Sequence, residues 1–249
     1  MNRHTYALLG ASILTIGGTT LFVSLVLVAS ESGAVVAIAI LVLGLVLVSL
    51  GQTKSVVPPS LALILAKSGY DNTARLIEEL GVHSRAVYLP SGLCEGVPLA
   101  AIPIAEHATL MRLKRPVESR LIARLGQGEM ALLITTPGSF SLEMLDAPVG
   151  HTLDEAASAL TTIVSGSLGL ATAVSISDKG DQLHVRLENC LQPALLQNGS
   201  LEMCLGSPPA SITATVLAES LERPVGFEFE KKEGAHLLVV LRQEEEVGT

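Results

Sequence analysis

The chain has 249 residues, of which 49% are apolar and 16% charged, and it carries a formal net charge of −8 at pH 7. The charged fraction lies well below the ~25% of ordinary soluble proteins. The acidic balance argues against nucleic acid as a partner, because binding of a phosphate backbone requires a basic surface.

Two long runs without a charge, Thr5–Ser30 and Ser32–Thr53, are separated only by Glu31. A helix needs about 20 apolar residues to cross the ~30 Å hydrocarbon core of a membrane, and each run is long enough. We therefore predict an N-terminal transmembrane helical hairpin with spans at about 5–29 and 33–53.

A secretory signal peptide is the alternative interpretation of the first run. However, the run is longer than the usual signal core of about 7–15 residues, and Val28-Ala29-Ser30 matches a cleavage site only loosely. Even after cleavage, the second run would remain as an anchor.

The few basic residues near the hairpin predict its orientation. Arg3 precedes the first run, Lys54 follows the second, and the loop between the runs holds no Lys or Arg. The positive-inside tendency then predicts a multi-pass protein of the cell membrane with a cytoplasmic body. The extracytoplasmic alternative rests on the sequon Asn198-Gly199-Ser200 and on Cys190 and Cys204, which could form a disulfide. The simpler interpretation is a turn and two reduced thiols.

Small residues recur every seven positions in both runs. They predict a helix-packing seam at Gly10, Gly17, Ser24, Ala37, Gly44 and Gly51. Such stripes let helix backbones approach closely. Packing of the two helices against each other is the simplest role, and contact with a partner or a second copy is the alternative.

The rest of the chain predicts an α+β body. We divide the protein into the hairpin (1–54), a membrane-proximal α+β region (55–150), a C-terminal αββαββ domain (151–243) and an acidic tail (244–249). In the second of these regions, the patterns predict a helix at Ser60–Leu80 that Ser68–Asp71 could break, strands at Arg85–Leu89 and Met130–Thr135, an edge strand at best at Val97–Ala105, and a helix at Arg120–Leu125.

The C-terminal region has the pattern of an internal repeat. Ser167-Leu168 matches Ser220-Leu221, and at the same offset Val174 and Ile176 match Phe227 and Phe229. Each half reads as a helix followed by two strands that alternate apolar and polar residues. We therefore predict a four-stranded antiparallel sheet with helices on one face, toward which the four matched apolar side chains point. Chance convergence on a hairpin pattern is the alternative.

No catalytic or metal motif stands out. The six histidines form no metal-spaced pair, and the three cysteines form no C-x-x-C, so we predict no catalytic residue, metal or cofactor. Ser165–Gly169 resembles a nucleophile elbow only weakly, because Ser165 replaces its first glycine. His184 and His236 lie at near-equivalent repeat positions, where surface histidines are the simple interpretation and a shared site is the alternative.

One basic cluster interrupts the acidic body. It consists of Arg112, Lys114, Arg115, Arg120 and Arg124. A solvated loop and helix face explains it most simply. Contact with anionic lipid head groups, at about 1 kcal/mol per basic residue, or with an acidic partner or phosphate is the functional alternative.

These patterns predict a membrane-anchored, non-enzymatic protein that binds or scaffolds a partner, or senses a ligand, at the membrane surface. A subunit of a larger membrane or envelope assembly has the same features. The expected partners are the lipid bilayer and a protein or second copy of the chain. The alternative is a membrane-tethered enzyme with its site at the C-terminal repeat interface.

Overall fold

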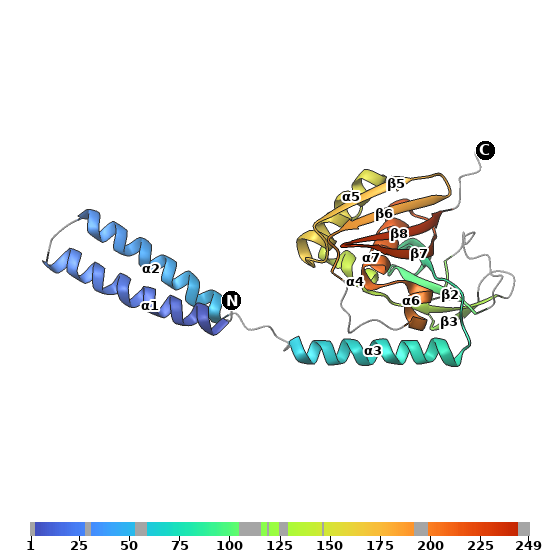
Figure 1. Cartoon of the computed structure of the whole chain (residues 1–249), viewed down its shortest axis with the longest axis horizontal. Coiled ribbons are helices and arrows are strands. Elements are labelled where there is room, and N and C mark those ends of the chain that lie inside the picture. The colour runs from blue at the N-terminus through green and yellow to red at the C-terminus, as the bar shows by residue number, and fades with distance from the viewer. Residues whose placement is uncertain are drawn as a thin grey trace. The chain divides into compact units, whose positions relative to one another are not determined.

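The chain forms two compact units, Met1–Ile64 and Leu65–Thr249 (Figure 1). The structure is a computed structural model. It describes residues 3–27, 31–52, 59–104, 116–118, 120–124, 129–145, 147–191 and 199–243.

The first unit contains an antiparallel pair of helices. Helix α1 (Arg3–Phe22) continues into a π-helical turn, η1 (Val23–Leu27), and α2 is Glu31–Gln52. Contacts between the helices run in opposite order along the two chains, since Gly10 lies beside Val48 and the later Gly17 lies beside the earlier Leu41. The pair is therefore a helical hairpin.

The prediction of a transmembrane hairpin is wrong. Among the residues that the structure describes, no helix combines the length and the apolar character needed to cross a membrane. The prediction counted uncharged residues as apolar, although Ser12, Thr15 and Thr19 of α1 are polar. In the structure, regular α-helical geometry in the first run also ends at Phe22. The predicted multi-pass membrane localisation and the cytoplasmic side of the body depended on those spans and are corrected with them.

The second unit combines helices with one large antiparallel sheet, and the α+β class is confirmed. Its helices are α3 (Pro59–Glu79, which begins in the first unit), η2 (Ser91–Leu93), α4 (Pro137–Ser141), η5 (Leu142–Met144), α5 (Leu153–Leu160), the π-helical η6 (Thr161–Ser167), α6 (Gly199–Leu205) and α7 (Pro208–Leu221). Its strands are β1 (Val87–Leu89), β2 (Leu99–Pro103), β3 (Ile122–Arg124), β4 (Met130–Ile134), β5 (Ala173–Asp178), β6 (Gln182–Glu188), β7 (Val225–Glu233) and β8 (His236–Gln243).

The predicted four-stranded sheet is wrong, because the sheet has eight strands in the order β3-β4-β2-β1-β7-β8-β6-β5. The four C-terminal strands form only one half. The start of β7 pairs with β1, where Val87 lies opposite Gly226 and Tyr88 opposite Val225. The backbone N–H of Phe227 also donates to the carbonyl oxygen of Ala86 at 2.9 Å. These bonds continue the sheet into its other half.

Two local predictions in the first half of the body are also wrong. The segment predicted as a helix at Arg120–Leu125 contains strand β3, which pairs with β4 through Ala123 and Ala131. Strand β2, predicted as an edge strand at best, lies between β4 and β1. Pro103, its last residue, lies opposite Ala131 of β4, but the pairing of β2 with β1 ends at Ala101 opposite Val87, so β1 does not extend to Pro103 and that side of the proline resembles an edge.

Helix α3 is continuous through Ser68–Asp71, where the sequence left a break open as an alternative. The hydroxyl of Ser68 donates to the carbonyl oxygen of Leu65 at 2.9 Å, and that of Thr73 donates to Gly69 at 2.9 Å. These polar side chains therefore bond to the helix rather than cap a new one.

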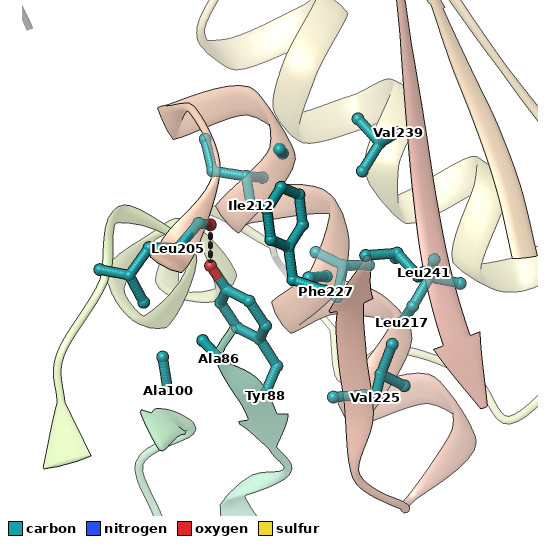
Figure 2. Packing of buried hydrophobic residues seen from close by; sticks show 14 of the residues in the cluster. Ala86, Tyr88, Ala100, Leu205, Ile212, Leu217, Val225, Phe227, Val239 and Leu241 are labelled. Atoms are coloured by element: carbon teal, nitrogen blue, oxygen red, sulfur yellow. Dashed lines mark hydrogen bonds between the residues drawn. The ribbon is translucent and has the colours of Figure 1, made fainter. Parts of the chain in front are cut away.

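The main core lies between the sheet and α7. Nearly every residue of α7 is buried, and the helix contacts α4, α5 and strands β1, β7 and β8. Figure 2 shows Phe227 beside Ile212 of α7. It also shows the hydroxyl of Tyr88, which donates to the carbonyl oxygen of Leu205 at 2.6 Å. Burial raises the pKa of Tyr88, so this hydroxyl keeps its proton at neutral pH.

A β-bulge in β7 reverses one part of the predicted core. Phe227 pairs with Leu241 and Phe229 with the next residue, Val240, so that Glu228 is the extra residue. Phe227 faces the core and is 4% exposed, whereas Phe229 faces away and is 44% exposed. The prediction that both phenylalanines point to the helices is therefore wrong for Phe229, because a bulge breaks the period of two.

The two phenylalanines give a test of this register. Phe227→Ala should lower the free energy of unfolding by roughly 3–5 kcal/mol, because it removes a buried aromatic ring, and Phe229→Ala should cost under about 1 kcal/mol. Urea unfolding of both variants provides the comparison. Equal losses, or a larger loss for Phe229→Ala, would show that the bulge lies elsewhere.

Candidate functional site

The predicted small residues line the contact between α1 and α2. Gly10, Gly17, Ser24, Ala37 and Gly44 are all buried, and the burial of Gly51 is not described. A Cβ added to Gly10 would lie 2.7 Å from the backbone nitrogen of Val48, and one added to Gly44 would lie 2.9 Å from the Cγ of Leu14. The two backbones therefore approach more closely than larger residues at these positions would allow.

The outer surface of the hairpin is apolar on both helices. Its exposed large side chains are Leu9, Ile16, Phe22, Val23, Val26, Val35, Val36, Ile38, Val42, Leu43, Leu45 and Val46. The seam uses small residues, so it leaves these large side chains without a partner inside the described part of the hairpin. Surfaces of this kind mark sites of association in proteins.

The side of α1 that faces away from α2 is more polar. The hydroxyls of Ser12, Thr15 and Thr19 donate to the carbonyl oxygens of Leu9, Ser12 and Ile16, each at 2.9 Å or less. Their protons are therefore used within the helix, and this side offers no strong donor to a ligand.

The structure describes only part of the predicted basic cluster. Arg112, Lys114 and Arg115 lie outside the described residues. Arg120 is exposed and its Nε lies 2.9 Å from a carboxylate oxygen of Glu118, while Arg124 is exposed on β3. Arg124 thus lies in strand β3 and Arg120 lies just before it, so neither belongs to the predicted helix.

The two repeat histidines do not meet. In the sheet register His184 lies opposite Val240, which is four residues from His236 on β8, or about 13 Å along the strand. The Nε2 of His184 lies 3.4 Å from Gln182 Oε1, and the Nδ1 of His236 accepts from the backbone N–H of Asn189. Each ring has a local partner.

All three cysteines are free thiols. Burial raises the pKa of the Cys94 thiol to about 11 and also raises the pKa of Cys190 and Cys204. Thiols with raised pKa stay protonated at neutral pH and are poor nucleophiles. The glycosylation sequon begins at Asn198, which lies outside the described residues.

A carboxylate holds the N-terminal end of α7. Glu230 of β7 accepts from the backbone N–H of Ser207 at 2.9 Å and from its hydroxyl at 2.5 Å. Ser207 is the N-cap residue of α7, so Glu230 satisfies a donor that the helix leaves unpaired and interacts favourably with the helix dipole. The bulge that exposes Phe229 also turns Glu230 toward this helix end.

The charge of Glu230 raises the pKa of several neighbouring groups, Glu202 and Tyr70 among them. Burial first, and then Glu230, raise the pKa of the Glu202 carboxyl on α6. Burial, Glu202 and Glu230 together raise the pKa of Tyr70 to about 12. Sequence reasoning missed this cluster, because the bulge in β7 and the contact between α6 and β7 leave no local pattern.

In the part of the chain that the structure describes, no group of three or more His, Cys, Asp or Glu side chains could hold a metal ion. The described residues therefore offer two features: the apolar hairpin surface and the carboxylate cluster around Glu230.

The fold and this surface define an α+β protein with an eight-stranded antiparallel sheet and an apolar helical hairpin. The chain belongs to the family described as a domain of unknown function (DUF7982), which matches residues 1–243. No curated protein and no solved structure matches it.

The raised pKa of Glu202 predicts a pH dependence of stability. A carboxyl whose pKa is higher in the folded state contributes stability that is present below its unfolded pKa of about 4.5 and is lost as the pH rises through the folded pKa. Glu202→Gln should therefore match the parent protein below pH 4.5 and unfold at a higher temperature at pH 7.

Thermal unfolding at both pH values provides the measurement. Glu79→Gln, at an exposed carboxylate on α3, is the matched control and should leave the difference between the two pH values unchanged. A Glu202→Gln variant that is less stable than its parent at pH 7 would contradict the assignment.

Proposed function

We propose that this protein is a non-enzymatic binding and scaffolding protein that associates with protein chains through the outer surface of its helical hairpin. The observation that carries the proposal is the set of twelve exposed large apolar side chains on α1 and α2. The largest apolar patch on a typical monomer covers roughly 300–600 Å², and larger patches mark interaction sites. A hairpin of helices with 20 and 22 residues is about 30 Å long, so a face two helices wide covers roughly 600 Å², at the top of that range.

Ion pairs within the body cross its sheet. On β7, Glu228 forms ion pairs of 3.3 Å with both Arg85 and Arg242, and Glu233 interacts with Arg186 and Lys231. These pairs link β6, β7, β8 and the segment before β1. Their charges are used within the sheet, as is typical of a rigid body.

The alternative of an enzyme at the repeat interface has less support. It would use His or Glu side chains of the repeat interface, but His184 and His236 lie about 13 Å apart along the sheet. The raised pKa values of the three thiols also disfavour a cysteine nucleophile.

Lysine substitutions on the hairpin test the proposal in the full chain. Ile16→Lys combined with Leu43→Lys introduces two charges that an apolar interface cannot bury without a large desolvation cost. Light scattering during size-exclusion chromatography should show an assembly for the parent protein and a single chain of 26.0 kDa for the double variant.

Thr19→Lys, on the polar side of α1, is the matched control and should leave the assembly intact. A parent protein that stays a single chain would contradict the proposal, as would an assembly that survives both lysines. Flotation of single chains with phosphatidylcholine vesicles would also contradict it.

A further inference from the structure

Strand β5 lies at one edge of the eight-stranded sheet (Figure 1). Among the strands that the structure describes, it pairs only with β6, in a regular register over Ala173–Asp178. At the turn, Lys179 donates its backbone N–H to the carbonyl oxygen of Gln182 at 2.9 Å. Backbone bonds alternate along an antiparallel pair, so the odd-numbered residues of β5 bond to β6. Val174 and Ile176 therefore direct their N–H and C=O groups outward, at the edge of the sheet.

Up to Ser177, this edge lacks three features that block the pairing of edge strands. These features are charged side chains, prolines and bulges. No residue from Ala156 to Ser177 is charged, and β5 contains no proline and no shift of register. The opposite edge strand, β3, has only three residues and includes the exposed Arg124. Of the two edges, β5 is therefore the one that can accept another strand.

The apolar layer of the sheet is incomplete at β5. Val174 and Ile176 lie opposite Leu187 and Val185 of β6 and share their face, toward the main core. The two residues of β6 are 0% exposed, whereas the two residues of β5 are only partly buried. A further strand beside β5 would cover the open flank of both side chains and continue this layer.

The sequence of β5 is complementary to itself in antiparallel orientation. With a two-fold axis at Ser175, Val174 lies beside the partner's Ile176, and Asp178 lies beside the partner's Thr172. Moving the axis by one residue in either direction would place the Asp178 carboxylate beside the partner's Val174 or the partner's Leu170. The register at Ser175 thus pairs apolar with apolar and polar with polar side chains.

The charge of the protein also favours this edge as the contact between two copies. Each chain has a formal net charge of −8, so two copies repel each other over most of their surfaces. The edge is uncharged up to Ser177, and the axis at Ser175 holds the two Asp178 residues about 20 Å apart along the strands, six residues from one another. A parallel pair would bring them together.

We infer that β5 pairs with the β5 strand of a second copy across a two-fold axis at Ser175, which joins two eight-stranded sheets into one. The inference rests on the proposed function. A single pair of strands is much smaller than the roughly 1,200 Å² that a stable interface buries. Association through the hairpins therefore holds the copies together and supplies the high effective concentration at which the two edges pair.

Disulfide formation in the full chain tests this arrangement. The background is Cys190→Ser, because Cys94 and Cys204 are buried. Ser175→Cys should form a covalent dimer on mild oxidation with diamide. Residues on the axis form a pair without mutual backbone hydrogen bonds, in which the Cα atoms lie about 4.5 Å apart, and a disulfide accepts roughly 4.4–6.8 Å.

Ser177→Cys is the matched control, at an exposed serine on the same face of the same strand. It should form no dimer, because four residues of strand separate it from the partner's Ser177 by about 13 Å. Adding Ile16→Lys and Leu43→Lys to Ser175→Cys should abolish the covalent dimer, since the hairpins then no longer hold the copies together.

The outcomes separate the inference from the proposed function. Absence of a dimer from Ser175→Cys, in a chain that light scattering still finds assembled, overturns the inference and leaves the proposed function standing. Dimers formed equally by Ser177→Cys overturn the two-fold register, and a dimer that survives the hairpin lysines overturns the dependence on the hairpin. A chain that light scattering finds single, and that forms no dimer, overturns both.

Discussion

The burial of α7 is the constraint on which the rest of the body depends. This helix is surrounded by the sheet and by α4 and α5, so it has no side that faces water. Its alanines at 210, 214 and 218 are fully buried and follow a spacing of four residues, which allows close approach of its neighbours. The hydroxyls of Thr213 and Thr215 donate to the carbonyl oxygens of Pro209 and Ser211, so they need no outside partner.

Both ends of α7 are tied to the sheet by carboxylates. Glu230 of β7 accepts from Ser207 at the start of the helix, and Glu219 near its end accepts from the backbone N–H of Ser91 at 2.8 Å and from the Ser91 hydroxyl. Ser91 follows β1, and β1 is the strand that joins the two halves of the sheet. The helix therefore holds together the two halves that adjoin at β1 and β7.

Sequence reasoning succeeds where the structure depends on neighbouring residues. Alternation of apolar and polar residues is a local signal, and it identifies the α+β class and the segments of β5–β8. It cannot reveal the pairing of β1 with β7, because those partners lie far apart in the chain. It also misses the bulge at Glu228, so that Phe229 was assigned to the wrong face and Glu230 was not recognised at all. On the hairpin, absence of charge was taken for the capacity to cross a membrane, which the described helices lack.

Native-state hydrogen exchange tests the central role of α7 most directly. If α7 is the element around which the body is built, its amides from Ile212 to Leu217 should exchange only through global unfolding, together with those of β8. Amides of the edge strands β3 and β5 should exchange through smaller openings, at lower free energies. Exchange of the α7 amides at a lower free energy than those of β5 would contradict this account.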